Sequence, residues 1–311
     1  MQKNRTPSVA VVVVTYNGRK WVDFCFGSLA KSVIPLNIIV VDNGSEDGTV
    51  DVIEQKYLDV HIIRSPDNLG FGKGNNLGME AALENKADYI FLLNQDAKIE
   101  PDTILKLVQK QKENPAYGIL SPVHLNGNGS ELDFKFSKHH MAPHKCEGLL
   151  SDLYLKNNID KIYKATTLNA AAWLLSRDCM EKVGGFHPLF SHYGEDDNYL
   201  HRAKSKKVGI GIYPEAVIYH DRNDRSKNSY FVDTYVMRKR ALLKALTNPL
   251  IKKPFQAQRK IVAWAVISSL IRLNGSQLKE SIRLLRFLYN VRSQLEEIKP
   301  SSEKEYPFLN T

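Results

Sequence analysis

The amino-acid sequence predicts an α/β fold, with a Rossmann-like, mostly parallel sheet flanked by helices and a helical extension at the C-terminus. Two observations predict the sheet. The first hundred residues alternate short β-branched runs with helical patterns, and runs such as VAVVVV and YIFLLN are apolar throughout, as in strands buried on both faces. A third observation, helical periodicity over residues 228–298, predicts the extension. We therefore expect two units, residues 1–227 and residues 228–311.

The N-terminal unit is expected to begin with three repeats of strand and helix, followed by a fourth strand. Each predicted strand ends at a cluster of turn residues, and each helical pattern places its apolar residues at the spacing of one helix face. Strands are predicted at residues 8–14, 37–42, 60–64 and 88–93, and helices at residues 19–32, 47–57 and 72–85.

The rest of the chain is expected to be mixed at first and then helical. A polar stretch at residues 126–145 predicts a loop or an irregular hairpin, and residues 208–219 predict paired strands around Tyr213-Pro214. The remaining predicted elements are a helix from about residue 101 to 112, strands at 117–121 and 166–176, helices at 178–183 and 196–206, and a helical region after 228 that is broken at Asn248-Pro249, Lys253-Pro254 and Asn274-Gly275.

Composition excludes several classes of protein. With 43% hydrophobic and 25% charged residues, the chain is neither disordered nor a polytopic membrane protein. Its three cysteines, Cys25, Cys146 and Cys179, form no CxxC pair, which argues against a disulfide framework and favours a reducing, cytoplasmic location. The longest apolar run, residues 261–271, is well short of the ~20 residues of a membrane-spanning helix. We expect no membrane-spanning segment.

The formal net charge of +9 is concentrated in the C-terminal extension. Residues 238–299 contain 14 Lys/Arg and 3 Asp/Glu, whereas residues 1–237 contain 28 basic and 29 acidic residues. Such a basic block can attract nucleic acid or anionic lipid, or it can be a solvated helical face. Because no helix-turn-helix or aromatic RNA-binding signature accompanies the block, nucleic acid is not an expected partner.

Polar segments follow each of the four N-terminal strands. In a doubly wound sheet, ligands bind at the carboxyl ends of the strands, so these segments are expected to line one edge. Each alone has a structural alternative as a turn, a helix cap or a tight loop, and the glycines at 70, 72 and 74 fit neither GxGxxG nor a P-loop. Their shared position favours a binding site. The segments are Thr15-Tyr16-Asn17-Gly18, Asp42-Asn43-Gly44-Ser45, residues 68–76 and Asn94-Gln95-Asp96.

Two acidic groups are candidates for chemistry. Asn94 and Asp96 are two residues apart in an extended segment, so they could present two oxygens to one cation that bridges a diphosphate, or only shape a turn. The run Glu195-Asp196-Asp197 opens a helix, where acids favour the helix dipole, and one of them with a raised pKa could act as general base. A lone histidine, His220, ends a strand and on its own is more often structural.

The order of these motifs resembles that of the family 2 glycosyltransferases of GT-A fold, and most closely of their rhamnosyltransferase-like bacterial members. The resemblance covers about residues 8–220 and implies an inverting transfer of a sugar, with rhamnose the first expectation, from a dTDP- or UDP-linked donor. The acceptor would be a hydroxyl of a glycan or a lipid-linked acceptor in surface polysaccharide synthesis. The motifs are VVVVTYNG, VVDNGSEDGT, NLGFGKGNNLG, FLLNQDA, AAWLLSRD, VGGFHPLFSHYGEDDNYLHRA and IYH.

The same resemblance implies roles for individual residues. It makes Asp196 the catalytic base, with Asp197 as the alternative, because the EDxD pattern of the family is Glu195-Asp196-Asp197-Asn198 here. It makes Asp96 and His220 the ligands of a Mg²⁺ or Mn²⁺ ion, although Asn94 at the first DxD position leaves fewer charged ligands. The residues expected to bind the nucleotide sugar are Thr15, Tyr16, Asn17, Asp42, Asn43, Gly70, Gly72, Asn75, Asn76, Asn94 and Gln95.

Two other classes of function remain as alternatives. The chain could be a catalytically weak scaffold that shares the GT-A fold, or a nucleic-acid- or lipid-binding protein that uses its basic C-terminal helices. The presence of Asp96, Asp196 and His220 argues against a weak enzyme. For the extension we expect contact with an anionic membrane surface at the inner membrane face, with packing into a homodimer as the alternative.

Overall fold

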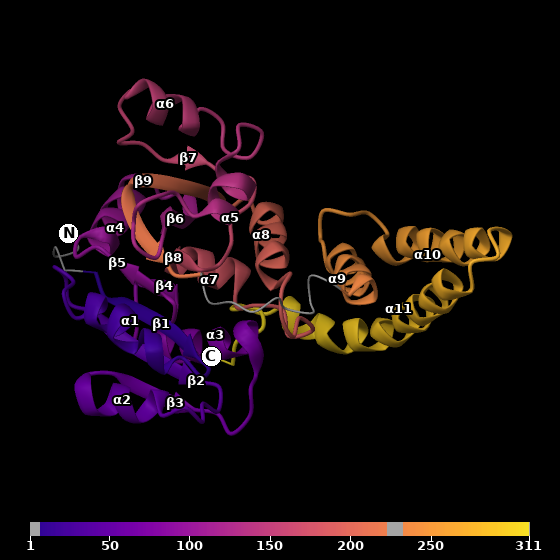
Figure 1. Cartoon of the computed structure of the whole chain (residues 1–311), viewed down its shortest axis with the longest axis horizontal. Coiled ribbons are helices and arrows are strands. Elements are labelled where there is room, and N and C mark those ends of the chain that lie inside the picture. The colour runs from indigo at the N-terminus through magenta and orange to yellow at the C-terminus, as the bar shows by residue number, and fades with distance from the viewer. Residues whose placement is uncertain (1–6, 223–232, 311) are drawn as a thin grey trace.

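The structure, a computed structural model, describes residues 7–222 and 233–310 (Figure 1). The described residues form a nine-stranded sheet in the order β3-β2-β1-β4-β8-β6-β9-β5, with β7 paired to β9. Helices pack on both faces of this sheet, and a group of helices projects away from it (Figure 1). The predicted fold class is confirmed.

Four neighbouring strands form a parallel half of the sheet. The elements of this half are β1 (Val9–Thr15), α1 (Val22–Leu29), β2 (Asn37–Asp42), α2 (Thr49–Lys56), β3 (His61–Arg64), α3 (Gly70–Glu84) and β4 (Tyr89–Asn94). Val12 belongs to one hydrophobic core with Met79 of α3, and Val13 belongs to another with Phe26 of α1. Because alternate residues of β1 face different cores, the strand needs an apolar side chain at every position.

The other half of the sheet is mixed. β8 runs antiparallel to β4 and β6, β6 runs parallel to β9, and β5 runs antiparallel to β9. This arrangement places the end of β9 beside the segment that follows β4, where a candidate site residue is expected from each. The elements are β5 (Ala97–Ile99), α4 (Thr103–Glu113), β6 (Tyr117–Asn126), β8 (Ala172–Ser176), α7 (Arg177–Val183), α8 (Glu195–Ser205) and β9 (Gly209–His220).

The prediction of paired strands at residues 208–219 is wrong, because this segment is the single strand β9. Its register with β6 shifts at the predicted turn, where Pro122 pairs with Tyr213 but Val123 pairs with Val217. The residues between these two pairs form a bulge. A bulge accommodates Pro214, which has no N–H to donate to the neighbouring strand.

The polar stretch at residues 126–145 begins as the irregular hairpin that the sequence predicts and then becomes helical. A bridge joins Leu125 to Leu132, after which α5 (Phe134–Phe136) and the π-helical turn η2 (Ser137–Met141) follow. Asp133 caps this helical part, since its Oδ1 accepts a hydrogen bond from the backbone N–H of Phe136 at 2.7 Å. Two further elements that the sequence pattern does not indicate are α6 (Leu149–Leu155) and β7 (Tyr163–Lys164).

Three helices form most of the described part of the C-terminal extension, and they project away from the sheet (Figure 1). The breaks between them lie where the sequence predicts, and Pro254 occupies the first turn of the second helix. Residues 228–232 of the predicted helical region lie outside the described residues. None of the described helices is long and apolar enough to cross a membrane. The helices are α9 (Thr234–Leu246), α10 (Pro254–Ile271) and α11 (Gly275–Ser302).

Candidate active site

Asp42 fastens the ends of β1 and β2 at the edge where the sequence predicts a site. Its Oδ1 accepts hydrogen bonds from Thr15 Oγ1 at 2.7 Å and Ser45 Oγ at 2.6 Å. Its Oδ2 accepts the backbone N–H groups of Gly44 at 3.1 Å and Ser45 at 2.8 Å. These four bonds occupy the lone pairs of both oxygens. Thr15 and Asp42 are therefore brought together, and Asp42 shapes the turn that borders the site.

Gln95 joins the segment after β4 to the segment after β1. Its side-chain Oε1 accepts the backbone N–H of Tyr16 at 3.0 Å, and its Nε2 donates to the Tyr16 carbonyl at 3.1 Å. Gly18 leaves room for this amide, because a Cβ there would overlap it. Asn17 accepts the backbone N–H of Glu46 at 2.9 Å. The Tyr16 side chain is exposed beside this fixed backbone, where its ring can stack on a base.

Glycines let the first turns of α3 approach both the sheet and α8. Gly70 has a φ of 78°, and a Cβ there would overlap the carbonyl of Ser191. A Cβ on Gly72 would lie 3.7 Å from the Cβ of Glu195, and one on Gly74 would lie 2.9 Å from β1. This close packing brings the glycine-rich segment against the acidic start of α8.

Asn43 and Asn75 lie beside these glycines and are buried. The Asn43 Nδ2 donates to the Gly70 carbonyl at 3.3 Å, and among the described residues its buried Oδ1 has no hydrogen-bond partner. The Asn75 Nδ2 donates to the carbonyl of Phe71 at 2.9 Å. A buried acceptor without a partner is costly unless a ligand or water satisfies it, so Asn43 has the hydrogen-bonding capacity expected of a binding residue.

The side-chain amide of Asn76 forms hydrogen bonds with the backbone of Phe186. Its Nδ2 donates to the Phe186 carbonyl at 2.9 Å, and its Oδ1 accepts the Phe186 N–H at 2.7 Å. This pair of bonds ties α3 to the loop that precedes α8. Asn76 therefore lies near the expected site with its amide engaged by the chain itself.

Asp96 and His220 form a buried pair at the mixed half of the sheet. The Oδ1 of Asp96 lies 3.2 Å from the Nε2 of His220, and the side chains are 3% and 0% exposed. The pairing of β5 with β9 sets this contact, because Ala97 lies opposite His220. Asn94 ends β4 and is half-buried, and its backbone N–H donates to the Ala171 carbonyl at 2.9 Å.

Two residues that the sequence does not single out complete this cluster. The Oδ2 of Asp133 lies 4.0 Å from the Nδ1 of His220 and 2.7 Å from the Nε of Arg222. No local pattern marks Asp133, which lies in a polar segment far from both partners in the sequence. Arg222 is only two residues after His220, so its place beside the predicted strand end is the one available signal.

The Asp96–His220 pair fits two neighbouring ligands of one divalent cation. Two ligand atoms at about 2.2 Å from an ion and at right angles to each other lie about 3 Å apart, close to the observed 3.2 Å. An imidazole beside a carboxylate favours Mn²⁺ over Mg²⁺, which prefers oxygen ligands. Within residues 7–222 and 233–310 there is no group of three or more His, Cys, Asp or Glu that could hold a metal. Further ligands would therefore have to come from substrate and water.

The three acids at the start of α8 have different surroundings. Burial and the Asp197 carboxylate raise the pKa of Asp196 to about 6. Burial, with a smaller effect from Asp196, also raises the pKa of Glu195, whose side chain is buried. The Oδ2 of Asp197 accepts a hydrogen bond from the Nζ of Lys244 at 2.6 Å. Asp197 is therefore engaged by a cation, whereas Asp196 combines a raised pKa with ionisation near neutral pH.

His140 on η2 links the surroundings of the two acidic groups. Its Nδ1 lies 3.2 Å from the Oγ1 of Thr167. Burial and His139 lower the pKa of His140 to about 4, and both Asp197 and Arg222 act on it electrostatically. The ring of His140 lies 5.4 Å from the ring of Phe136, and Phe136 belongs to the same hydrophobic core as Tyr199 of α8. The helical segment that Asp133 caps therefore packs into the same core as α8. The sequence pattern does not indicate His140.

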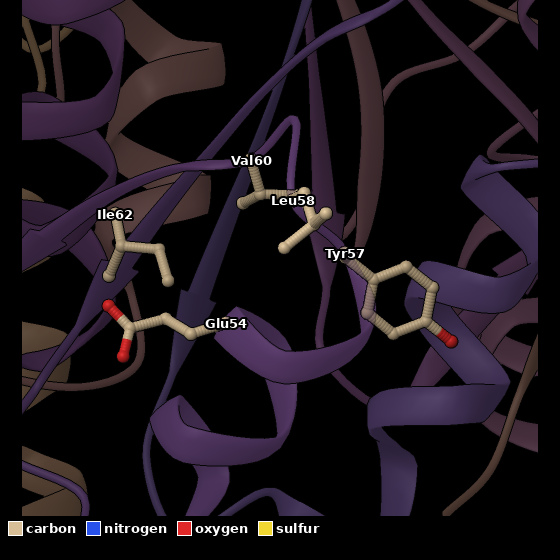
Figure 2. A pocket seen from close by; sticks show the side chains of 5 residues that line it. All are labelled: Glu54, Tyr57, Leu58, Val60 and Ile62. Atoms are coloured by element: carbon tan, nitrogen blue, oxygen red, sulfur yellow. The ribbon is translucent and has the colours of Figure 1, made fainter.

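A shallow hollow lies elsewhere, at the edge of the sheet formed by α2 and β3 (Figure 2). It contains none of the predicted site residues, and one of its lining side chains, Leu58, is 85% exposed. We assign no role in catalysis to it. The lining residues are Glu54, Tyr57, Leu58, Val60 and Ile62.

Comparison with protein families gives a match over more than half of the chain. Residues 10–184 match the family model described as glycosyl transferase family 2. Among curated proteins, the N-acetylglucosaminyl-diphospho-decaprenol L-rhamnosyltransferase of Mycobacterium tuberculosis is 25% identical over 237 residues, which is 70% of this chain and 77% of the relative. The low-salt glycan biosynthesis hexosyltransferase Agl10 of Haloferax volcanii is 23% identical over 213 residues, covering 68% of this chain and 66% of the relative.

Comparison with solved structures supports the fold. The structure of TarS residues 1–349 from S. aureus in complex with UDP-GlcNAc has a TM-score of 0.57 and 17% identity, covering 92% of each chain. The mannosyltransferase PcManGT from Pyrobaculum calidifontis, in complex with GDP-Man and Mn²⁺, has a TM-score of 0.55 and 18% identity, covering 96% of this chain and 82% of the other. At these identities the likeness concerns the fold alone.

Proposed function

Because the chain belongs to glycosyl transferase family 2, it is a glycosyltransferase, and we propose that it moves a sugar from a nucleoside diphosphate to an acceptor hydroxyl with inversion. One observation supports this assignment above the others. Asp196, a partly buried carboxylate with a raised pKa, lies in the first turn of α8, which shares a hydrophobic core with Phe136. Asp133, which caps the turn of Phe136, lies 4.0 Å from His220 of the Asp96–His220 pair. A base and a diphosphate site are what a direct displacement requires.

In this proposal Asp196 removes the proton of the acceptor hydroxyl as that oxygen attacks the sugar. A carboxylate with a pKa near 6 is a stronger base than an ordinary one and is still ionised at neutral pH. Asp197 is the weaker candidate, because Lys244 stabilises its charge at 2.6 Å. Glu195 is buried against Gly72 of α3, and its raised pKa favours the protonated form.

Asp96 and His220 would hold a divalent cation at the diphosphate. When bound, such a cation neutralises negative charge that develops on the departing nucleoside diphosphate. Arg222, fixed by Asp133 at 2.7 Å, brings a permanent positive charge to the same cluster. Tyr16, Asn43 and the glycines of α3 would bind the nucleotide at the parallel edge.

We expect the donor to be dTDP-rhamnose first, with UDP-linked hexoses next, and the acceptor to be a lipid-linked glycan. The rhamnosyltransferase among the relatives supports the sugar at only 25% identity. The test is a turnover screen of dTDP-rhamnose, UDP-GlcNAc and GDP-mannose, each with Mn²⁺, with Mg²⁺ and with EDTA, using an N-acetylglucosaminyl-diphospho-polyprenol acceptor. Release of nucleoside diphosphate with transfer to the acceptor is expected for one donor. Absence of release from all donors would contradict the proposed function.

We also propose that the C-terminal extension lies on an anionic membrane surface. One stripe of α10 is apolar and exposed, with Trp264 66% and Ile271 72% exposed. Basic residues flank it at both ends, at Arg259-Lys260 and at Arg272. An apolar stripe between cations suits the boundary between headgroups and acyl chains, and each cation near an anionic surface contributes about 1 kcal/mol. The exposed apolar residues of α10 are Ile261, Trp264, Ile267, Leu270 and Ile271.

Vesicle co-sedimentation tests this proposal. The full chain should bind phosphatidylserine-rich vesicles more tightly than phosphatidylcholine vesicles, and the binding should weaken with salt because the attraction is partly electrostatic. The double variant Trp264→Glu, Ile271→Glu should lose most of the binding. Leu155→Glu on α6 is the matched control, since Leu155 is also exposed, at 63%, but lies outside the extension. The proposal would be contradicted if the wild-type chain bound neither kind of vesicle and formed a dimer that the double variant disrupts.

A further inference from the structure

The last described residues of the chain return from the end of α11 to the catalytic unit, where Figure 1 shows the C-terminus beside α3. We call residues 306–310 the C-terminal clasp. Leu309 is 6% exposed and belongs to the same hydrophobic core as Phe186 and Tyr199. The clasp is therefore part of the core of the catalytic unit, although in the sequence it follows the three helices of the extension.

Two consecutive glycines accommodate the clasp. The backbone N–H of Gly185 donates to the Pro307 carbonyl at 2.8 Å. A Cβ on Gly184 would overlap the backbone of Pro307, and one on Gly185 would lie 2.5 Å from the side chain of Leu309. The Gly184-Gly185 pair, which directly follows the end of α7 at Val183, is thus shaped to the clasp.

The clasp also contacts the helix that bears the acids. The ring of Phe308 lies 4.8 Å from the ring of His187 and 4.9 Å from the guanidinium of Arg202 on α8. Arg202 in turn donates to the carbonyls of Val183 and Gly185. Phe308 therefore covers the guanidinium that fixes α8 to the end of α7.

Asn76 of α3 is the common point of these contacts. Its Nδ2 donates to the Phe308 carbonyl at 3.4 Å as well as to Phe186. On the same helix, Gly72 packs against the side chain of Glu195, directly before Asp196. The side-chain amide of Asn76 thus joins α3 both to the clasp and to the loop that leads into α8.

We propose that the clasp, through Phe308, is a positioning element that holds Asp196 in register with the donor-binding turn of α3. The inference rests on the proposed role of Asp196 as general base. Phe308 touches neither of the two acidic groups, and it acts through Arg202 and Asn76. Small displacements of a base are costly, because a mutation far from the reacting atoms that misplaces a catalytic group by about 1 Å can lower the rate about 10²-fold.

The test uses full-length Phe308→Ala. We expect kcat to fall by roughly 10-fold or more while the KM for the donor changes less than about twofold, because the donor-binding side of α3 keeps its own contacts. Amide hydrogen exchange should become faster in residues 184–203. Phe308→Tyr retains a ring over Arg202 and should restore most of kcat, whereas Phe308→Leu, which retains only apolar bulk, should not.

Tyr154→Ala removes a ring that is 86% exposed on α6 and is the matched control, expected to leave kcat unchanged. If Phe308→Ala does not fold, Phe308→Leu replaces it in the same comparison. A lower Tm with kcat within about twofold of the wild type, measured well below that Tm, would show that the clasp only stabilises the fold and would overturn the inference. Failure of the proposed function is distinguishable, since the wild-type chain itself would then transfer no sugar.

Discussion

Replacing Asp196 with Asn should lower kcat by roughly 10² to 10⁴ and leave the affinity for the nucleoside diphosphate almost unchanged. The amide keeps the shape of the side chain but accepts no proton from the acceptor hydroxyl. Asp196 is the second residue of α8 and so lies on a different element from the strand ends that would bind the nucleotide. Initial rates combined with calorimetric titration of the diphosphate separate the two effects.

The pH dependence of the wild-type enzyme should report the ionisation of Asp196. Burial and Asp197 raise the pKa of Asp196 to about 6. A base must be deprotonated to act, so kcat/KM should be high above pH 6 and fall about tenfold per pH unit below it. An ordinary aspartate would lose activity only near pH 4. Asp196→Asn should lack this acid limb.

Asp197→Asn is the matched control for this assignment. The variant loses the ion pair with Lys244 and one anion beside Asp196, so the limb should move to lower pH while most of kcat is retained. If Asp196→Asn kept more than about a tenth of the wild-type rate, and Asp197→Asn lost nearly all of it, Asp197 would be the base.

The parallel half of the fold could be predicted because its determinants are local. Each strand has an apolar run at its centre, and each is followed by turn residues. The single strand β9 could not be predicted, because its Pro214 is accommodated by a bulge against β6, a partner about ninety residues earlier. The helical turn that Asp133 caps also depends on distant packing, since Phe136 and Met141 are buried in a core with Trp173 and Tyr199.

The candidate site shows the same difference between local and distant determinants. The positions of Thr15, Asp96 and Asp196 follow from strand ends and a helix start. What each polar side chain binds does not, because an amide that binds a ligand and one that fastens backbone look alike in a sequence. Gln95 pairs with Tyr16, and Asn76 pairs with Phe186, across separations that no local pattern indicates.

Replacing Asp96 with Asn should weaken binding of the nucleoside diphosphate in the presence of Mn²⁺ by about 10²-fold or more. The substitution keeps the size of a side chain that is 3% exposed and its contact with His220, so the fold should survive while one negative ligand is lost. In the absence of metal, wild type and variant should bind the diphosphate with similar affinity. Calorimetry with Mn²⁺ and with EDTA gives both comparisons.

Asp133→Asn provides the matched comparison, because Asp133 lies 4.0 Å from the Nδ1 of His220, whereas Asp96 faces Nε2, and it forms the ion pair with Arg222. A residue that only orients a ligand typically costs 10- to 100-fold in metal affinity, so Asp133→Asn should show a smaller loss than Asp96→Asn and still respond to Mn²⁺. An Asp96→Asn variant whose diphosphate affinity rises with Mn²⁺ as much as that of the wild type would refute the assignment of Asp96 as a ligand. The buried Asp96–His220 pair would then have only a structural role, and Arg222 would neutralise the negative charge of the diphosphate.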